Sequence, residues 1–288
     1  MARRQAAGER PYNTMSVAEA REMATRLSRL SSPGETVASV SDRLIPGPVE
    51  QIPIRIYKPD AEGALPLFVF FHGGGWVVGN LETGDTLCRA ITNAAKCAVV
   101  SVNYRHAPEH KFPAAVDDAY AALCWCAENA VELGGTADQL SVGGFSAGGN
   151  LATVVSLIAR DKGGPKIKTQ VLIAPITNHS FDTNSYHECG EGYGLTSGMM
   201  KWFWNHYLNS PEEGSHPYAS PSQAKDLSGL PPALVINAEF DPLRDEGQAY
   251  AQQLKASGVE VETKFYEGMI HMFMGPQAVR DIAKWINR

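Results

Sequence analysis

Short, unbroken apolar runs alternate with stretches of helical periodicity along most of this 288-residue chain, and this alternation constrains its fold most. Apolar runs of this length, rich in Val and Ile, are typical of strands covered on both faces. The predicted strands are residues 67–71, 98–104, 140–145, 171–175, 233–238 and 261–266. Helical stretches lie between most of them, at about 84–96, 114–133, 149–160 and 246–256. We therefore predict one α/β fold with a mainly parallel sheet flanked by helices, because right-handed crossovers join parallel strands.

The segment before this alternation has a different pattern. Residues 15–30 show amphipathic helical spacing and end at Ser-Ser-Pro-Gly, residues 31–34, which is a strong stop signal. Residues 49–59 then alternate apolar and polar side chains, as an edge strand does.

Nearly sixty residues, 176–232, separate the predicted strands 171–175 and 233–238, far more than one crossover helix requires. Loops that leave the carboxyl ends of parallel strands gather at the functional edge of the sheet. We therefore expect a helical cap at 176–232, joined by a short N-terminal cap segment, 1–45, over a catalytic domain at 46–288. The insertion holds a cluster of large apolar side chains that suits either cap packing or an apolar substrate pocket: Met199, Met200, Trp202, Phe203, Trp204 and Tyr207.

The sequence GFSAG at 144–148 stands directly after one predicted strand and directly before a helix. In a G-x-S-x-G turn the serine occupies a strained position, and the flanking glycines let strand and helix approach closely. The helix N-terminus also directs its positive end at the place where negative charge develops. This strand–turn–helix context makes Ser146 the predicted nucleophile.

Three consecutive glycines follow the strand at 67–71, in the sequence HGGGW at 72–76. Such a loop can direct backbone N–H groups at a tetrahedral oxyanion, with a further N–H from Ala147 after the nucleophile. Trp76 lies beside this loop, so we expect it to bound the substrate pocket, and Phe145 beside the nucleophile to contact substrate.

A serine hydroxyl needs a neighbouring base, and in this kind of fold the order along the chain is Ser, acid, His. Among eight histidines, His271 follows the last predicted strand in a turn that can reach the carboxyl edge of the sheet. Asp241 lies three residues beyond Ala238, at the end of the preceding strand, whereas Asp245 stands at the start of the next helix. We therefore predict Asp241 as the acid and Asp245 as a helix cap or dipole partner.

At these residues the chain resembles the hormone-sensitive-lipase-like carboxylesterases, the bacterial family IV. The matching segments are HGGGW at 72–76, YRHAPEHKFPAA at 104–115, GFSAGGN at 144–150, DPLRDEG at 241–247 and GMIHMF at 268–273. The resemblance implies an α/β-hydrolase fold with a helical cap, and a triad of Ser146, Asp241 and His271. It also implies oxyanion donors at Gly74, Gly75 and Ala147.

The resemblance further implies hydrolysis of short- to medium-chain carboxylic esters through an acyl-enzyme, without a cofactor or metal, and pairing of two copies through the last strand. The chain departs from the family at Phe145, where an Asp is usual, and in an N-terminal cap that lacks a first helix. In YRHAPEHKFPAA we expect Arg105 and Glu109 to brace the loop rather than to touch substrate.

Two other functions use the same scaffold. A non-catalytic small-molecule binding protein is one, since the plant gibberellin receptors resemble this family, but a receptor has no need of His271. An amidase or peptidase is the other.

The remaining expectations come from charge and composition. A net charge of −6 without a long Lys/Arg run gives no reason to expect nucleic-acid binding. No run of 18 apolar residues predicts membrane insertion, and MARRQAAGER lacks the apolar stretch of a secretory signal. Five cysteines without such a signal suggest reduced thiols in the cytoplasm.

Overall fold

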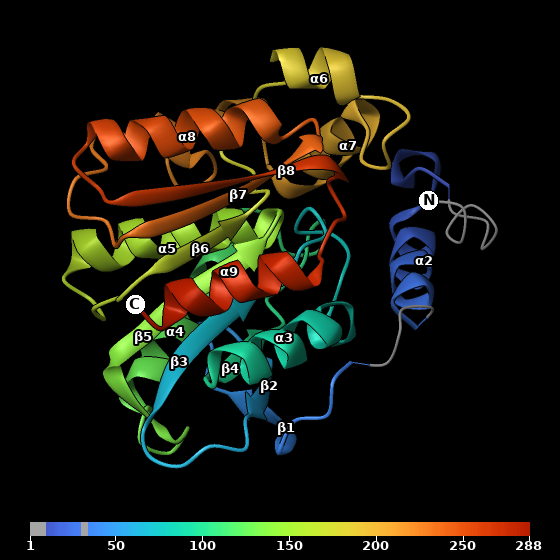
Figure 1. The fold of residues 1–288 in the computed structure, drawn as a ribbon. Coiled ribbons are helices and arrows are strands. Elements are labelled where there is room, and N and C mark those ends of the chain that lie inside the picture. The colour runs from blue at the N-terminus through green and yellow to red at the C-terminus, as the bar shows by residue number, and fades with distance from the viewer. Residues whose placement is uncertain (1–9, 30–33) are drawn as a thin grey trace.

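The central sheet has eight strands in the order β1-β2-β4-β3-β5-β6-β7-β8 (Figure 1) in the computed structural model, which describes residues 10–29 and 34–288. The strands are β1 Ser39–Ile45, β2 Ile52–Lys58, β3 Leu65–Phe71, β4 Ala98–Val102, β5 Gly135–Phe145, β6 Gln170–Ile173, β7 Ala233–Phe240 and β8 Val261–Ile270. From β3 to β8 neighbouring strands run parallel, while β1 and β2 are antiparallel to their neighbours. All six predicted strands are confirmed, but β8 lies at the edge of the sheet and none of its residues is fully buried.

Helices cover both faces of the sheet, which explains why β3 reads as an unbroken apolar run. Helices α3 Leu81–Ala95 and α9 Pro276–Ile286 pack in one core cluster, which contains Phe68 and Phe70 of β3. Helices α4 Ala114–Glu128, α5 Ala147–Lys162 and α8 Arg244–Ala256 pack in the other, which contains Leu67, Val69 and Phe71. Successive side chains of a strand point to opposite faces, so both sets must be apolar.

The edge prediction for residues 49–59 is wrong, because β1 pairs along the outer side of β2 from Ser39 to Ile45. Strand β1 carries Ser, Asp and Arg side chains and is exposed along most of its length, so it lacks the apolar pattern of a core strand. The sheet therefore begins within the range 1–45 that the sequence assigns to the N-terminal cap segment.

The insertion between β6 and β7 is helical, as predicted. It contains α6 Asn184–Cys189, α7 Ser197–Tyr207 and the short 3₁₀ helices η2 Pro211–Ser215 and η3 Pro221–Gln223. Thr183 and Thr196 accept hydrogen bonds from backbone N–H groups of the first turns of α6 and α7, as N-cap residues do. Most of the apolar cluster of α7 is buried in the main core, which favours the packing interpretation.

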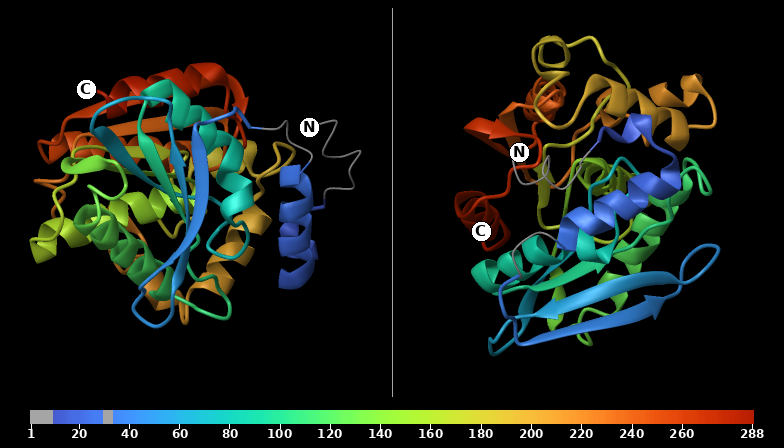
Figure 2. Two further views of the ribbon diagram at one scale, coloured as in Figure 1. Left: turned by 90° about the horizontal axis from the view of Figure 1, so that it is seen from below. Right: turned by 90° about the vertical axis from the view of Figure 1, so that its right-hand side faces the viewer.

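The N-terminal segment lies beside this insertion. It consists of η1 Tyr12–Thr14 and α2 Val17–Arg29, so the predicted helix is confirmed, while most of its stop signal, residues 31–33, lies outside the described residues. Figure 2 shows η1 next to α7, where the rings of Tyr12 and Phe203 are 5.9 Å apart. The division into cap and catalytic domain stays a prediction.

At the opposite edge β8 is the last strand, as predicted, and it leaves Phe265 and Met269 exposed. Pairing of two copies through this edge also stays a prediction. Within the described ranges, none of the helices combines the length and the apolar character needed to cross a membrane.

Candidate active site

Ser146 lies in a strained turn between β5 and α5. Its backbone has φ 58° and ψ −117°, a conformation that non-glycine residues seldom adopt. The flanking glycines are required by close approach of the backbone: a Cβ on Gly144 would lie 2.2 Å from the carbonyl oxygen of Gly148. A Cβ on Gly148 would lie 1.9 Å from the carbonyl oxygen of Phe71 in β3. The turn thus holds the Ser146 side chain at the carboxyl edge of the sheet.

Asp241 and His271 reach the same edge because they directly follow β7 and β8, which are parallel neighbours. The Nδ1 atom of His271 lies 2.8 Å from Oδ2 of Asp241, and its Nε2 atom lies 3.1 Å from Oγ of Ser146. The Asp241 carboxylate also accepts the N–H of Leu243 at 2.9 Å. With Nδ1 protonated toward the carboxylate, Nε2 is free to accept the serine proton. The structure therefore brings the three predicted residues together.

The glycine-rich loop, residues 72–80 and hereafter the oxyanion loop, packs against the nucleophile turn. A Cβ on Gly73 would lie 2.6 Å from the ring of Phe145. Gly74 and Gly75 have φ values of +123° and +58°, so side chains there would strain the backbone. The carbonyl of Gly74 accepts the N–H groups of Val77 and Val78, which folds this part of the loop into one turn. The role of Gly74, Gly75 and Ala147 as oxyanion donors stays a prediction.

Two histidines pack together at the start of the oxyanion loop, the buried His72 and the half-buried His106. The ring of His72 stacks on Tyr104 at 4.5 Å, and the Tyr104 hydroxyl donates to the His72 carbonyl at 2.7 Å. Burial lowers the pKa of His72 to about 4, and burial together with the charge of His72 lowers the pKa of His106 to about 3. Both side chains are therefore neutral at neutral pH. The ring within hydrogen-bond distance of the Ser146 hydroxyl is that of His271, at 3.1 Å.

The two residues expected to brace this loop, Arg105 and Glu109, both form ion pairs with neighbouring helices. The Arg105 guanidinium binds Asp118 of α4 at 2.8 Å, and Glu109 binds Arg21 of α2 at 2.6 Å. Sequence reasoning missed both partners, because ordinary amphipathic helices contain such charged residues at many positions.

The two predicted substrate contacts lie in different surroundings. The Trp76 ring is fully buried and stacks on Tyr207 of α7 with centroids 4.0 Å apart, so it anchors the oxyanion loop to the insertion. The Phe145 ring is partly exposed and lies 4.9 Å from the ring of His271. Substrate contact stays a prediction for both.

Sequence reasoning also missed Glu246, a buried carboxyl group near the triad. Its Oε1 atom accepts the N–H groups of Thr177 and Asn178, at 2.7 and 3.2 Å, where the insertion begins. Burial, with a contribution from the charge of Asp241, raises the pKa of Glu246 to about 8. In the sequence it reads as an ordinary acidic residue in the first helical turn, and only the tertiary fold buries it.

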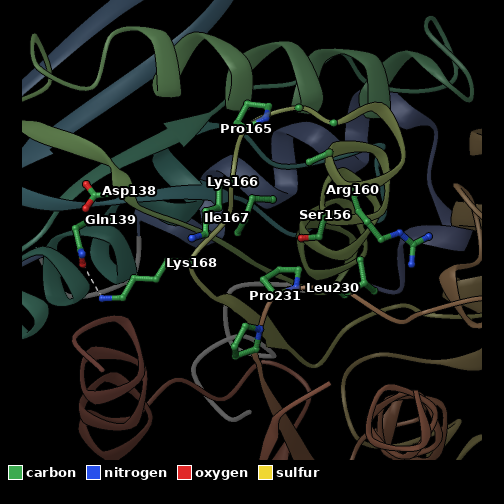
Figure 3. Close-up of a pocket in the computed structure, with 15 residues that line it drawn as sticks. Asp138, Gln139, Ser156, Arg160, Pro165, Lys166, Ile167, Lys168, Leu230 and Pro231 are labelled. Carbon is green, nitrogen blue, oxygen red and sulfur yellow. Dashed lines mark hydrogen bonds between the residues drawn. The ribbon is translucent and has the colours of Figure 1, made fainter. Parts of the chain in front are cut away.

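A cavity of about 640 Å³ lies away from these residues (Figure 3). Its lining includes Arg160 at the end of α5, Lys168 before β6 and Pro231 before β7. The cavity therefore lies at the amino ends of the parallel strands, whereas the triad lies at their carboxyl ends. None of the predicted site residues lines it. In the described part of the chain, no three His, Cys, Asp or Glu side chains gather as a metal site would need.

Comparisons with known proteins agree with the observed fold. The family described as alpha/beta hydrolase fold matches residues 68–275. Carboxylic ester hydrolase LipN of Mycobacterium tuberculosis is 46% identical, over 84% of this chain and 66% of its own length. An arylesterase of Saccharolobus solfataricus is 38% identical, over 93% of this chain and 88% of its own. Among solved structures, the metagenomic carboxylesterase EstE1 superposes with a TM-score of 0.92 at 44% identity, covering 95% of this chain and 97% of that one.

Proposed function

Since this chain belongs to the α/β-hydrolase family, as a carboxylic ester hydrolase of the hormone-sensitive-lipase-like group, we propose that it transfers the acyl group of an ester to Ser146 and then to water. One observation carries the proposal: two hydrogen-bond distances, 2.8 and 3.1 Å, connect Asp241 through His271 to Ser146. An unbroken connection of this kind is what converts a weakly nucleophilic hydroxyl into an attacking group.

In the proposed reaction, Oγ of Ser146 attacks the ester carbonyl while Nε2 of His271 takes its proton. Asp241 holds the imidazole in the required tautomer and stabilises the imidazolium that forms. The tetrahedral oxyanion is bound by the N–H groups of Gly74, Gly75 and Ala147. His271 then gives its proton to the leaving alkoxide, and water repeats the sequence on the acyl-enzyme.

The test is Ser146→Ala, which we expect to lower kcat by about 10⁶-fold, as in a comparable serine hydrolase. Ser156→Ala is the matched control, because Ser156 lies in α5, the helix that follows Ser146, and its hydroxyl donates within that helix to the carbonyl of Ala152. Turnover of simple esters by the unmodified protein distinguishes an esterase from a binding protein on this scaffold. A folded Ser146→Ala protein with unchanged turnover would falsify the proposal.

We further propose a preference for short acyl groups. Ser146 and His271 are only 5% and 3% exposed, and two aromatic side chains of α7 pack against the oxyanion loop, Tyr207 on Trp76 and Phe203 next to Gly75. A long acyl chain therefore has to displace packed side chains, at a cost in binding free energy. In a series of 4-nitrophenyl esters, kcat/KM should peak at butanoyl or hexanoyl. Faster hydrolysis of the hexadecanoyl ester contradicts this preference.

A further inference from the structure

Arg21 of the N-terminal helix binds the backbone of the oxyanion loop. We infer that Arg21 is a positioning residue, which holds this loop in the shape that directs its N–H groups at the oxyanion. The inference rests on the proposed function, because it assigns to Arg21 an effect on the reaction at Ser146.

The guanidinium of Arg21 joins three separate points of the chain. Its Nε donates to the carbonyl of Val77 and one Nη to the carbonyl of Ala107, both at 2.9 Å. Its two Nη atoms also donate to the carboxylate of Glu109, at 2.9 and 2.6 Å. A planar, forked donor can make all these bonds at once, whereas the single ammonium of a lysine cannot match the geometry.

The two carbonyls lie next to the residues that shape the oxyanion loop. Val77 donates its N–H to the carbonyl of Gly74, so a displacement of Val77 moves the turn that contains Gly74 and Gly75. Ala107 donates its N–H to the carbonyl of Trp76, which links the segment that contains Ala107 and Glu109 to the oxyanion loop. Arg21, which lies in α2, therefore holds both the oxyanion loop, at Val77, and the segment bonded to it, at Ala107.

The positioning role of Arg21 depends on its hydrogen bonds to the carbonyls of Val77 and Ala107 rather than on its ion pair with Glu109. The side chain of Glu109 is 53% exposed, and ion pairs in contact with water contribute little to stability. The bonds to Val77 and Ala107 are partly buried, and losing them leaves two carbonyls without this donor. Another hydrogen bond joins α2 to the last residue of the oxyanion loop: the side-chain amide of Asn80 donates to the hydroxyl of Thr25. It is longer, at 3.3 Å.

The experiment compares Arg21→Ala, Arg21→Lys and Glu109→Gln in kcat and KM for 4-nitrophenyl butanoate. Arg29→Ala is the matched control, an arginine at the end of the same helix. We expect Arg21→Ala to lower kcat about tenfold with KM within about twofold, since oxyanion donors act on the transition state. This loss is smaller than the 10²–10³-fold cost of removing an oxyanion donor outright. Arg21→Lys should recover part of kcat, and Glu109→Gln and Arg29→Ala should lose little.

A second readout is the rate at which a 4-nitrophenyl phosphonate labels Ser146, because that reaction also needs the oxyanion loop. The labelling rate should fall in parallel with kcat in Arg21→Ala. A purely structural role predicts a lower Tm with unchanged kcat and unchanged labelling below that Tm, and this result overturns the inference, as does a change confined to KM. If Arg21→Ala does not fold, a wild-type kcat in Arg21→Lys overturns it. Absence of labelling at Ser146 in the wild-type protein points instead to failure of the proposed function.

Discussion

Two aspartates four residues apart have different partners, although both follow β7. Asp241 contacts His271 at 2.8 Å, whereas Asp245 accepts the N–H of Ser185 in α6 at 2.8 Å and binds Arg244. Asp245 therefore holds the insertion against α8, which goes beyond the helix cap or dipole partner expected from the sequence. The roles of these two carboxylates can be distinguished by matched substitutions.

Asp241→Asn should lower kcat by about 10⁴-fold in a protein that still folds, because the imidazolium loses its stabilising charge and its tautomer is no longer fixed. Asp245→Asn should leave kcat nearly unchanged and lower the free energy of unfolding by about 1 kcal/mol. Steady-state kinetics and urea unfolding on both variants check this. An inactive but stable Asp245→Asn protein beside an active Asp241→Asn protein would move the assignment by one helical turn.

At the scale of elements, the contact between α5 and β3 depends on the absence of a side chain at Gly148. A Cβ there would meet carbonyl oxygen and carbon atoms of Phe71 at 1.9 and 2.5 Å, and backbone atoms of a central strand cannot move aside. The nucleophile turn is thus part of the packing between helix and sheet as well as part of the site.

We therefore expect Gly148→Ala to lower the free energy of unfolding by about 3 kcal/mol and to reduce activity, because α5 must move away from β3. Gly163→Ala is the control at the other end of the same helix. Gly163 has φ +62° and nothing within 4 Å of an added Cβ, so only backbone strain of about 1 kcal/mol opposes the change. Chemical denaturation compares the two, and equal stability of the variants contradicts the packing argument.

For the whole molecule, two buried ionisable groups, His72 and Glu246, and the half-buried His106 set opposite limits on stability as pH changes. The pKa of His72 is lowered to about 4 and that of His106 to about 3, from 6.5 in an unfolded chain. Below pH 6.5 the unfolded state therefore binds more protons, so these groups make stability fall as pH falls. The pKa of Glu246 is raised from 4.5 to about 8, so the folded state binds more protons in that window and stability falls as pH rises.

Taken together, these three groups predict a stability maximum near pH 6.5. Each group changes the free energy of unfolding by up to about 1.4 kcal/mol per pH unit. Between pH 4.5 and 6.5 the combined effect of the two histidines exceeds the opposite effect of Glu246, so stability rises with pH. Above pH 6.5 only the effect of Glu246 remains among the three, so stability falls. Glu246→Gln should flatten the decline between pH 6.5 and 8, and His106→Gln should flatten the decline between pH 6.5 and 5. Urea unfolding at pH 5, 6.5 and 8 measures both. An unchanged slope above pH 6.5 in Glu246→Gln argues against a raised pKa at that position.

The amino-acid sequence by itself determined the six parallel strands of the sheet and indicated the three residues predicted to form the triad. Apolar runs indicate strands, and parallel strands bring their carboxyl ends to one edge of the sheet. The G-x-S-x-G motif and the order of Ser, acid and His along the chain therefore pointed to Ser146, Asp241 and His271 at that edge. These inferences need only local patterns and one topological rule.

Tertiary structure alone decided the rest, because it depends on contacts between residues far apart in the chain. The exposed strand β1 has no apolar pattern, and pairing with β2 defines it. Arg21 lies 56 residues from Val77, and Glu246 lies 69 residues from Thr177, so neither residue carries a local sign of its partner. Burial and hydrogen-bond partners of such groups are properties of the packed molecule, in which the free energy of each side chain depends on neighbours that only folding brings together.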